Sequence, residues 1–193
     1  MMIHTLLKTQ LGLSDALLDL LLAKAVHKTY DKNDLLFNAS APVSQLLFVE
    51  KGLLRGYRLI DGVDITHHFF ELHWFATDYQ SYLTGQPGEL YLQALTEVEV
   101  YKWEKAQMDQ MAKEHSPIAQ ILQQIAERAY LHMVERCKNL QTQDLKERYW
   151  RLIHKTPELF QQVPQRHIAS YLGVAPQSLS RVKFQAKNSG FTP

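Results

Sequence analysis

Residues 165–182 carry the spacing that most constrains the fold, because small and apolar residues recur where two short crossed helices need them. A small residue, Ala169, stands four positions before Gly173. Helices that cross steeply through a short turn approach closely, which a small side chain tolerates, and the turn needs the positive φ that glycine adopts readily. The apolar positions that hold such a pair against neighbouring helices are Ile168, Leu172, Val174, Leu179 and Val182. The stretch therefore predicts a helix-turn-helix motif, a common means of binding double-stranded DNA.

The second helix of this pair is expected to begin at Pro176, whose fixed φ suits a first helical position. Gln177 and Arg181 then lie one turn apart on the outward face. Glutamine can bond adenine and arginine can bond guanine in the major groove, so we predict that these two residues read bases. Contacts to DNA phosphates are expected from Arg166, Ser178, Ser180 and Lys183. The alternative for each is an ordinary solvated surface residue.

The net charge of +1 hides an uneven distribution. Residues 146–193 hold eight Lys or Arg against two acids, a net +6, whereas the remainder holds thirteen against eighteen, a net −5. A basic end on an acidic body indicates a polyanion partner for that end, although a basic helical tail can also simply stay solvated.

The single cysteine, Cys137, permits no disulfide within the chain and no iron–sulfur cluster held by several thiolates. The first 26 residues are too often interrupted by polar residues for a signal core or a spanning helix. We therefore expect a cytoplasmic protein without a membrane partner.

The pattern changes along the chain before the C-terminal stretch. Residues 15–26 have the apolar spacing of a short helix, with Ser14 in the N-cap position. From Tyr30 to Trp103 short strand-like runs alternate with turn signals, of which Asp61-Gly62 is a good example because a type I′ hairpin turn needs positive φ at both central residues. The alternation lapses over residues 75–89, where we expect a short helix or loop. Residues 1–115 are thus predicted to form an N-terminal antiparallel β-roll with a helix before it.

A long helix is expected next, over residues 116–141. Its apolar residues recur every three or four positions in one stripe: Ile118, Leu122, Ile125, Ala129, Met133, Cys137 and Leu140. A helix that extends beyond its own domain commonly lays such a stripe on a copy of itself, so we predict a dimer interface there. Packing of the stripe on the roll of the same chain is the alternative. The pattern breaks at residues 141–144, where Thr142 can cap the next helix, and residues 142–193 are expected to form a C-terminal domain.

This α+β arrangement of roll, long helix, hinge and helix pair resembles the Crp/Fnr family of bacterial transcription regulators over nearly the whole chain. The segment ERYWRLIHKTPELFQQVPQRHIASYLGVAPQSLSRVK is similar to short family members of the Bacteroidetes type. The segment LFVEKGLLRGYRLIDGVDITHHFF resembles the glycine-marked hairpins of the cyclic-nucleotide-binding fold. The resemblance implies a homodimer that binds a pseudo-palindromic operator, with the roll as sensor of a small-molecule effector and with rotation of the small domain about residues 141–144.

The sequence departs from the family pattern in two places. Members that bind cyclic nucleotides have a glycine-glutamate turn followed by an arginine-serine or arginine-threonine pair, where this chain has Ala76-Thr77 and Gly88-Glu89. Since residues 59–101 also contain no Lys or Arg but seven acids, a buried cyclic phosphate would lack a counter-charge, and we expect no response to cyclic AMP. The residues after Phe184 are too few for the β-hairpin wing of many relatives, so the C-terminal domain is expected to lack a full wing.

A metal-dependent, cupin-like β-roll enzyme is the competing interpretation. If residues 65–73 form one strand, His67, Glu71 and His73 share a face while His68 lies on the other. The cupin pattern also needs a distant third histidine, and none occurs between residues 74 and 114. We therefore expect no enzyme, no cofactor and no metal site. An aromatic run is expected to be core, with an apolar effector pocket as the alternative: Phe69, Phe70, Trp74, Phe75, Tyr79, Tyr82 and Tyr91.

Overall fold

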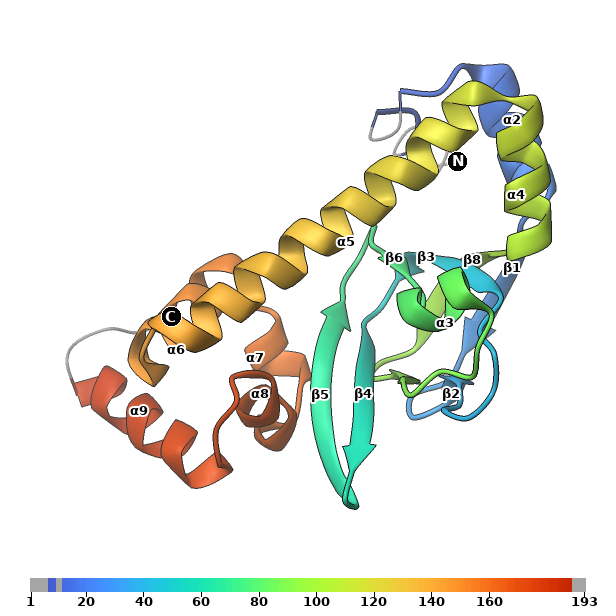
Figure 1. The fold of residues 1–193 in the computed structure, drawn as a ribbon. Helices are drawn as coiled ribbons and strands as arrows, with labels where there is room; N and C mark the ends of the chain where they lie inside the picture. Colours follow the sequence, from blue (N-terminus) through green and yellow to red (C-terminus); the bar gives the residue numbers. More distant parts are fainter. Residues whose placement is uncertain (1–6, 10–11, 189–193) are drawn as a thin grey trace. The chain divides into compact units, whose positions relative to one another are not determined.

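The computed structural model describes residues 7–9 and 12–188 of the 193-residue chain (Figure 1). Its contacts divide the chain into two compact units, each made of two segments. Unit 1 comprises Met1–Gly56 and Phe69–Arg128, and unit 2 comprises Tyr57–His68 and Ala129–Pro193. The division into 1–115, 116–141 and 142–193 stays a prediction.

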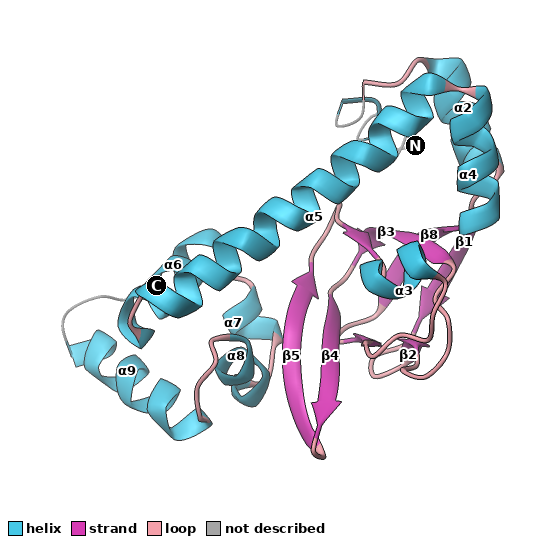
Figure 2. Ribbon diagram, in the orientation of Figure 1, coloured by secondary structure: helices cyan, strands magenta, loops and turns pink. Residues whose placement is uncertain are grey.

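Within the described residues, eight strands form two four-stranded sheets (Figure 2). Their orders are β1-β8-β3-β6 and β2-β7-β4-β5, and β8 pairs antiparallel with both β1 and β3. The predicted antiparallel roll is therefore confirmed. The strands are β1 (Val26–Tyr30), β2 (Leu35–Phe37), β3 (Gln45–Lys51), β4 (Leu54–Ile60), β5 (Val63–Phe70), β6 (Phe75–Ala76), β7 (Tyr91–Ala94) and β8 (Val98–Glu104).

The two sheets share an apolar core because side chains alternate between the faces of each strand. Leu47 and Val49 of β3 lie in this core with Leu54 of β4 and with Leu92 and Ala94 of β7. Phe70 also packs there, which fits the prediction that the aromatic run is mostly core. The helix α3 (Tyr79–Thr84) occupies the region where the strand pattern lapses, as expected.

Helix α2 (Asp15–Ala23) begins where the sequence indicates. Ser14 is the N-cap, and its hydroxyl accepts a hydrogen bond from the Leu17 amide at 3.4 Å. The helix ends at Ala23, so the prediction that it continues to Val26 was wrong. Residues from Val26 instead form β1, because pairing with β8 satisfies their backbone groups, and local periodicity carries no record of that partner.

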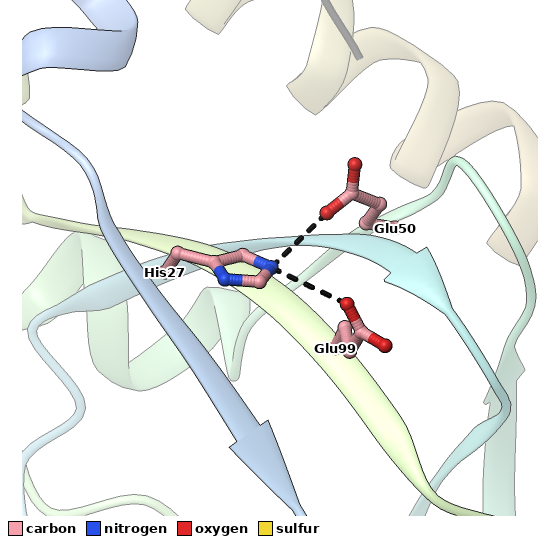
Figure 3. Close-up of side chains that lie close together, drawn as sticks. All are labelled: His27, Glu50 and Glu99. Atoms are coloured by element: carbon pink, nitrogen blue, oxygen red, sulfur yellow. Dashed lines mark hydrogen bonds and ion pairs between the residues drawn. The ribbon is translucent and has the colours of Figure 1, made fainter. Parts of the chain in front are cut away.

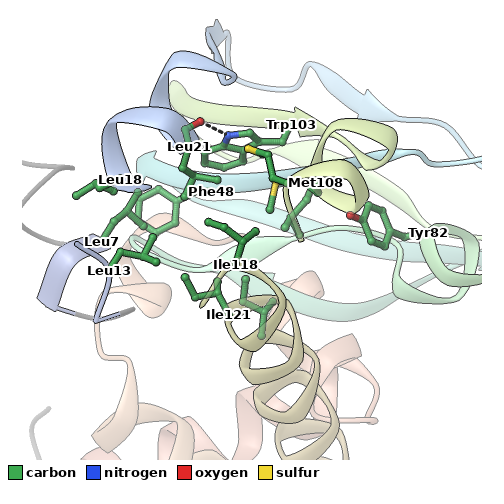
Figure 4. Close-up of a cluster of buried hydrophobic side chains, with 13 residues drawn as sticks. Leu7, Leu13, Leu18, Leu21, Phe48, Tyr82, Trp103, Met108, Ile118 and Ile121 are labelled. Atoms are coloured by element: carbon green, nitrogen blue, oxygen red, sulfur yellow. Dashed lines mark hydrogen bonds between the residues drawn. The ribbon is translucent and has the colours of Figure 1, made fainter. Parts of the chain in front are cut away.

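A second core lies where α2, α4 (Lys105–Glu114) and the first turns of α5 (Ser116–Thr142) meet the β3-β8 sheet within unit 1 (Figure 4). Trp103 is buried there, and its indole N–H donates to the Leu21 carbonyl oxygen at 2.7 Å. Tyr82, Met108 and Ile118 pack in the same cluster. Tyr82 therefore also serves as core, which again fits the interpretation of the aromatic run.

The described part of unit 2 contains the outer part of the β4-β5 hairpin, the second half of α5 and four further helices. Asp61 and Gly62 have φ values of 51° and 78°, which confirms the predicted two-residue hairpin turn. The helices after α5 are α6 (Leu145–Lys155), α7 (Leu159–Gln162), α8 (Gln165–Tyr171) and α9 (Pro176–Asn188). None of the helices in the described part of the chain is long and apolar enough to span a membrane.

The break between α5 and α6 is capped differently from the prediction. Thr142 is still the last residue of α5, and its hydroxyl donates to the Lys138 carbonyl oxygen. Asp144 caps α6 instead, because its carboxylate accepts from the Glu147 amide at 2.8 Å while the Glu147 carboxylate accepts from the Asp144 amide at 3.0 Å. This reciprocal capping box satisfies two amides that a threonine two residues earlier cannot reach.

Candidate nucleic-acid interface

Two helices of unit 2, α8 and α9, are joined by a short connection at residues 172–175. Gly173 has a φ of 72°, the left-handed conformation expected of it from the sequence. Its amide donates to the Ser170 carbonyl oxygen, and the next amide, of Val174, donates to the Ala169 carbonyl oxygen, both at 3.0 Å. A Cβ added at Gly173 would lie 3.2 Å from a methyl group of Leu140 on α5. Both backbone conformation and space therefore favour glycine.

The apolar positions of the helix pair lie inside or at the edge of unit 2. Ile168, Ala169, Leu172 and Leu179 are buried, and the two valines at positions 174 and 182 are half-buried. The six residues other than Gly173 are thus at least partly buried, and the role of all seven positions as a helix-turn-helix core stays a prediction. Contact with DNA would depend on the residues that the pair exposes on its outer surface.

Outward residues of the pair include both residues predicted to read bases. Gln177 and Arg181 are exposed and one turn apart in the first half of α9, and Arg166 is exposed near the start of α8. Arginine and glutamine side chains in this position are free of the apolar core and can reach a ligand. Their roles toward DNA remain predictions.

The serines of α9 have other surroundings than we expected. The Ser180 hydroxyl donates to the Pro176 carbonyl oxygen at 3.0 Å and accepts from the Gln165 amide group at 2.6 Å. Ser180 therefore links α9 to α8, which argues against its predicted phosphate role. Ser178 and Lys183 are half-buried. The contribution of Gln165 was missed, because a hydrogen bond across two helices leaves no trace in local spacing.

The tip of the β4-β5 hairpin contacts α8 within unit 2. The Thr66 amide donates to the Ser170 hydroxyl oxygen at 2.8 Å, and that hydroxyl donates to the Asp64 carbonyl oxygen at 3.3 Å. Ser170 thus satisfies two backbone groups of strand β5. Because these residues are about 105 positions apart in the chain, local sequence patterns cannot predict this link.

A basic cleft lies beside the helix pair, between α5, α6 and α8. Arg136, Arg148, Arg151 and Lys155 line it together with Glu135, which binds Arg151 at 2.8 Å. The Arg136 guanidinium stacks 4.3 Å from the centre of the Tyr171 ring and donates to the Tyr171 carbonyl oxygen at 2.8 Å. This concentration of cations agrees with the basic character of residues 146–193.

Two histidines pack against each other near these cations. The rings of His68 and His132 are 4.5 Å apart and nearly perpendicular. Burial lowers the pKa of His68 well below its ordinary value, and the neighbouring His132, His67, Arg136 and Lys155 lower it further. Burial also lowers the pKa of His132. Both imidazoles are therefore neutral at pH 7.

The apolar stripe of α5 is used differently from the prediction. Ile118 and Ile125 are buried in the core of unit 1, and Leu122 packs against it, so the burial contradicts the assignment of Ile118 and Ile125 to a dimer interface. A side chain claimed by its own domain is not available to a second copy. Of the remaining stripe residues, Ala129 and Met133 are half-buried.

Another face of α5 is exposed and apolar in unit 2. Tyr130 and Val134 are 68% and 45% exposed, and Cys137 is exposed one turn further along. Leu131, 63% exposed, flanks them. Residues at these spacings lie on one side of a helix, and we call Tyr130, Leu131, Val134 and Cys137 the exposed α5 face. Sequence reasoning missed all but Cys137 because it followed the most regular aliphatic spacing.

The histidines behind the cupin interpretation do not share one strand. Strand β5 ends at Phe70, and His73 has a φ of 66° in the turn that follows. Glu71 and His73 therefore lie outside strand β5, and the alternation that would place them on one face with His67 ends before them.

Comparison with known proteins supports the arrangement described above. Residues 27–115 match the cyclic nucleotide-binding domain family. A search of curated protein sequences gave no significant match.

Solved structures share the fold over most of the chain. FixK2 from Bradyrhizobium japonicum has a TM-score of 0.73 at 18% identity, with 88% of this chain and 89% of that chain covered. The c-di-GMP-responsive global regulator CLP from Xanthomonas campestris has a TM-score of 0.73 at 17% identity, covering 92% and 93%. A protein from Eubacterium rectale assigned to the Crp/Fnr family of transcriptional regulators has a TM-score of 0.72 at 16% identity, covering 93% and 86%. Residues 27–115 are thus similar to a cyclic nucleotide-binding domain, and the chain shares its fold with these solved structures.

The carboxylate of Asp78, the N-cap residue of α3, lies beside Gly88, which is between α3 and β7. Asp78, only 4% exposed, accepts hydrogen bonds from the Ser81 amide at 3.3 Å and the Leu90 amide at 3.2 Å. A Cβ added at Gly88 would lie 2.4 Å from the same carboxylate, so Asp78 fills the space beside that glycine. A phosphate at this point would meet a buried carboxylate that already holds the backbone donors.

Proposed function

We propose that the chain is a sequence-specific DNA-binding transcription regulator of the Crp/Fnr type. The observation that carries this proposal is the α8-α9 pair, which presents Gln177 and Arg181 outward from the basic end of a chain with the regulator fold. The comparisons do not favour the alternative of a metal-dependent enzyme.

In the proposed complex the first half of α9 enters the major groove. Arg181 forms a two-pronged hydrogen bond with guanine, and Gln177 does so with adenine, while Arg166 binds a backbone phosphate. Because Ser180 is engaged with Gln165 and Pro176, we assign it to holding α9 in register with α8 rather than to DNA.

The proposed regulator acts as a homodimer in the cytoplasm. Two copies place their α9 helices about one turn of DNA apart, roughly 34 Å, on a pseudo-palindromic site. The exposed α5 face is the surface that we assign to the partner copy, because exposed aromatic and aliphatic side chains on one helix face gain most from burial.

We also propose that the roll does not respond to cyclic AMP. Asp78 occupies the position beside Gly88, and residues 59–101 supply no Lys or Arg to neutralise a phosphate. Any small-molecule effector would therefore be of another chemical class. Its signal has a route within unit 2, since the β4-β5 hairpin is hydrogen-bonded to α8 through Ser170.

Replacing Arg181 with Ala tests the proposal directly. Preferred sites are first selected from random duplex DNA with the unaltered protein, and binding of those sites is then compared. We expect Arg181→Ala to weaken them by about 1–3 kcal/mol and to relax base preference at one position of each half-site. Arg128→Ala, which removes an exposed arginine of α5, is the control and should leave the preference unchanged. An unaltered selectivity profile for Arg181→Ala would refute the assignment.

A further inference from the structure

Three side chains from three different strands converge on the surface of the first sheet in unit 1 (Figure 3). The His27 Nε2 atom lies 3.1 Å from a carboxylate oxygen of Glu50 and 3.6 Å from one of Glu99. One ligand atom from each of the three residues lies within 4.8 Å of the other two. The residues are far apart in sequence, so only the sheet brings them together.

The pairing of strands explains this convergence. His27 lies opposite Tyr101 in the β1-β8 register, and Glu99 lies two residues from Tyr101, so all three share one face of the sheet. On β3 the register with β8 shifts between Val49 and Lys51, where Glu50 is the extra residue of a bulge. Bulges re-aim side chains and are frequent beside functional sites. Here the bulge lies at Glu50, whose carboxylate lies next to the His27 imidazole.

The distances from the imidazole nitrogen to the two carboxylates suit a metal ion. Two ligands bound at about 2.1 Å from a tetrahedral Zn²⁺ are roughly 3.4 Å apart, and the observed 3.1 and 3.6 Å lie on either side of that value. An imidazole nitrogen and carboxylate oxygens are ligands that first-row divalent ions accept. The His27 side chain is 43% exposed, so water can complete the coordination.

Neighbouring residues hold the two carboxylates in place. The Lys51 ammonium binds Oε1 of Glu99 at 3.1 Å and Oε1 of Glu97 at 2.7 Å. The remaining oxygen of Glu99, Oε2, is the one that lies near His27. The Tyr101 hydroxyl interacts with the Glu50 carboxylate, and the ring of Tyr101 packs 4.7 Å from the imidazole. Such outer hydrogen bonds orient the ligands in metal sites.

We propose that His27, Glu50 and Glu99 bind one divalent first-row transition-metal ion, with Zn²⁺ as the representative. The ion would join β1 to β3 and β8 and would add a metal-dependent stabilisation of the roll. This inference is independent of DNA binding, since every residue in it lies in unit 1. A metal-free cluster in which His27 is hydrogen-bonded to the carboxylates is the competing explanation of the same geometry.

Titration calorimetry of the full chain, freed of metal by a chelator, tests the proposal with ZnCl₂ at pH 7. We expect one Zn²⁺ per chain. His27→Ala and Glu50→Gln should weaken binding by more than the roughly 10- to 100-fold typical of losing an outer-shell partner. Tyr101→Phe should weaken it by about tenfold, as expected of a positioning residue. Thermal unfolding of the unaltered chain should move to higher temperature with Zn²⁺.

Two matched controls make the result specific. Glu97→Gln removes a carboxylate that also binds Lys51 but is not among the three converging residues, and His154→Ala removes an exposed histidine of unit 2. Both should bind Zn²⁺ as the unaltered chain does. The proposal is overturned if the chain binds no stoichiometric Zn²⁺, or if His27→Ala and Glu50→Gln bind it no more weakly than these controls.

Discussion

Replacing Gly173 with Ala measures how tightly the α8-α9 pair is built. At a φ of 72° an alanine occupies the left-handed region, which costs about 1–2 kcal/mol, while loss of glycine's freedom in the unfolded chain returns about 0.4–1 kcal/mol. The new Cβ would also lie 3.2 Å from a Leu140 methyl group, and overpacking of that kind costs about 1–3 kcal/mol. We therefore expect Gly173→Ala to lower the free energy of unfolding of unit 2 by about 2–3 kcal/mol.

Gly62 provides the matched control for this experiment. It also belongs to unit 2 and has a φ of 78°, but a Cβ there would meet no atom within 4 Å. Gly62→Ala should therefore show the conformational term alone, about 1 kcal/mol.

Urea unfolding followed by hydrogen exchange of α8 and α9 amides gives both free energies. In a Leu140→Ala background, Gly173→Ala should lower the free energy of unfolding by less than it does in the unaltered chain, whereas the effect of Gly62→Ala should not change. If Gly173→Ala costs no more than Gly62→Ala, the close approach of α5 to the turn does not constrain the pair.

Three further predictions concern assembly, ligand and pH. Since Cys137 is the chain's one cysteine, mild oxidation should give a disulfide-linked dimer. Val134→Asp should reduce the yield of this dimer and the mass measured by sedimentation. A protein that stays monomeric at all concentrations would contradict the assignment of the exposed α5 face to the partner copy. Calorimetric titration with cyclic AMP should give no heat of binding, and micromolar affinity would overturn the inference from Asp78. The folded-state pKa of His68 is depressed, so its contribution to stability is complete above pH 6.5 and falls below it, by up to about 1.4 kcal/mol per pH unit. His68→Phe should reduce the change in the free energy of unfolding of unit 2 between pH 5 and 7, whereas His154→Ala should not. Equal pH slopes in the two variants would show that titration of His68 does not contribute to the stability of unit 2.

Local signals predicted those parts of the molecule whose conformation depends on neighbouring residues. Asp61-Gly62 requires positive φ at both positions, and Gly173 with Ala169 requires a close turn, so both were found from the sequence. Ser14 likewise marks the start of α2, because capping is a contact with an amide three residues away.

Tertiary structure decided the features that depend on distant partners. Strand β1 exists because β8 pairs with it, and the inward face of α5 was set by the core that claims Ile118 and Ile125. The approach of Glu50 and Glu99 to His27 depends on the register of three strands and on a bulge. The sequence by itself determined the Asp61-Gly62 turn, the Ser14 cap of α2 and the spacing of the helix pair, because these depend on short-range contacts. Which face of a helix or strand is covered was decided only by folding, because burial depends on residues far away in the chain.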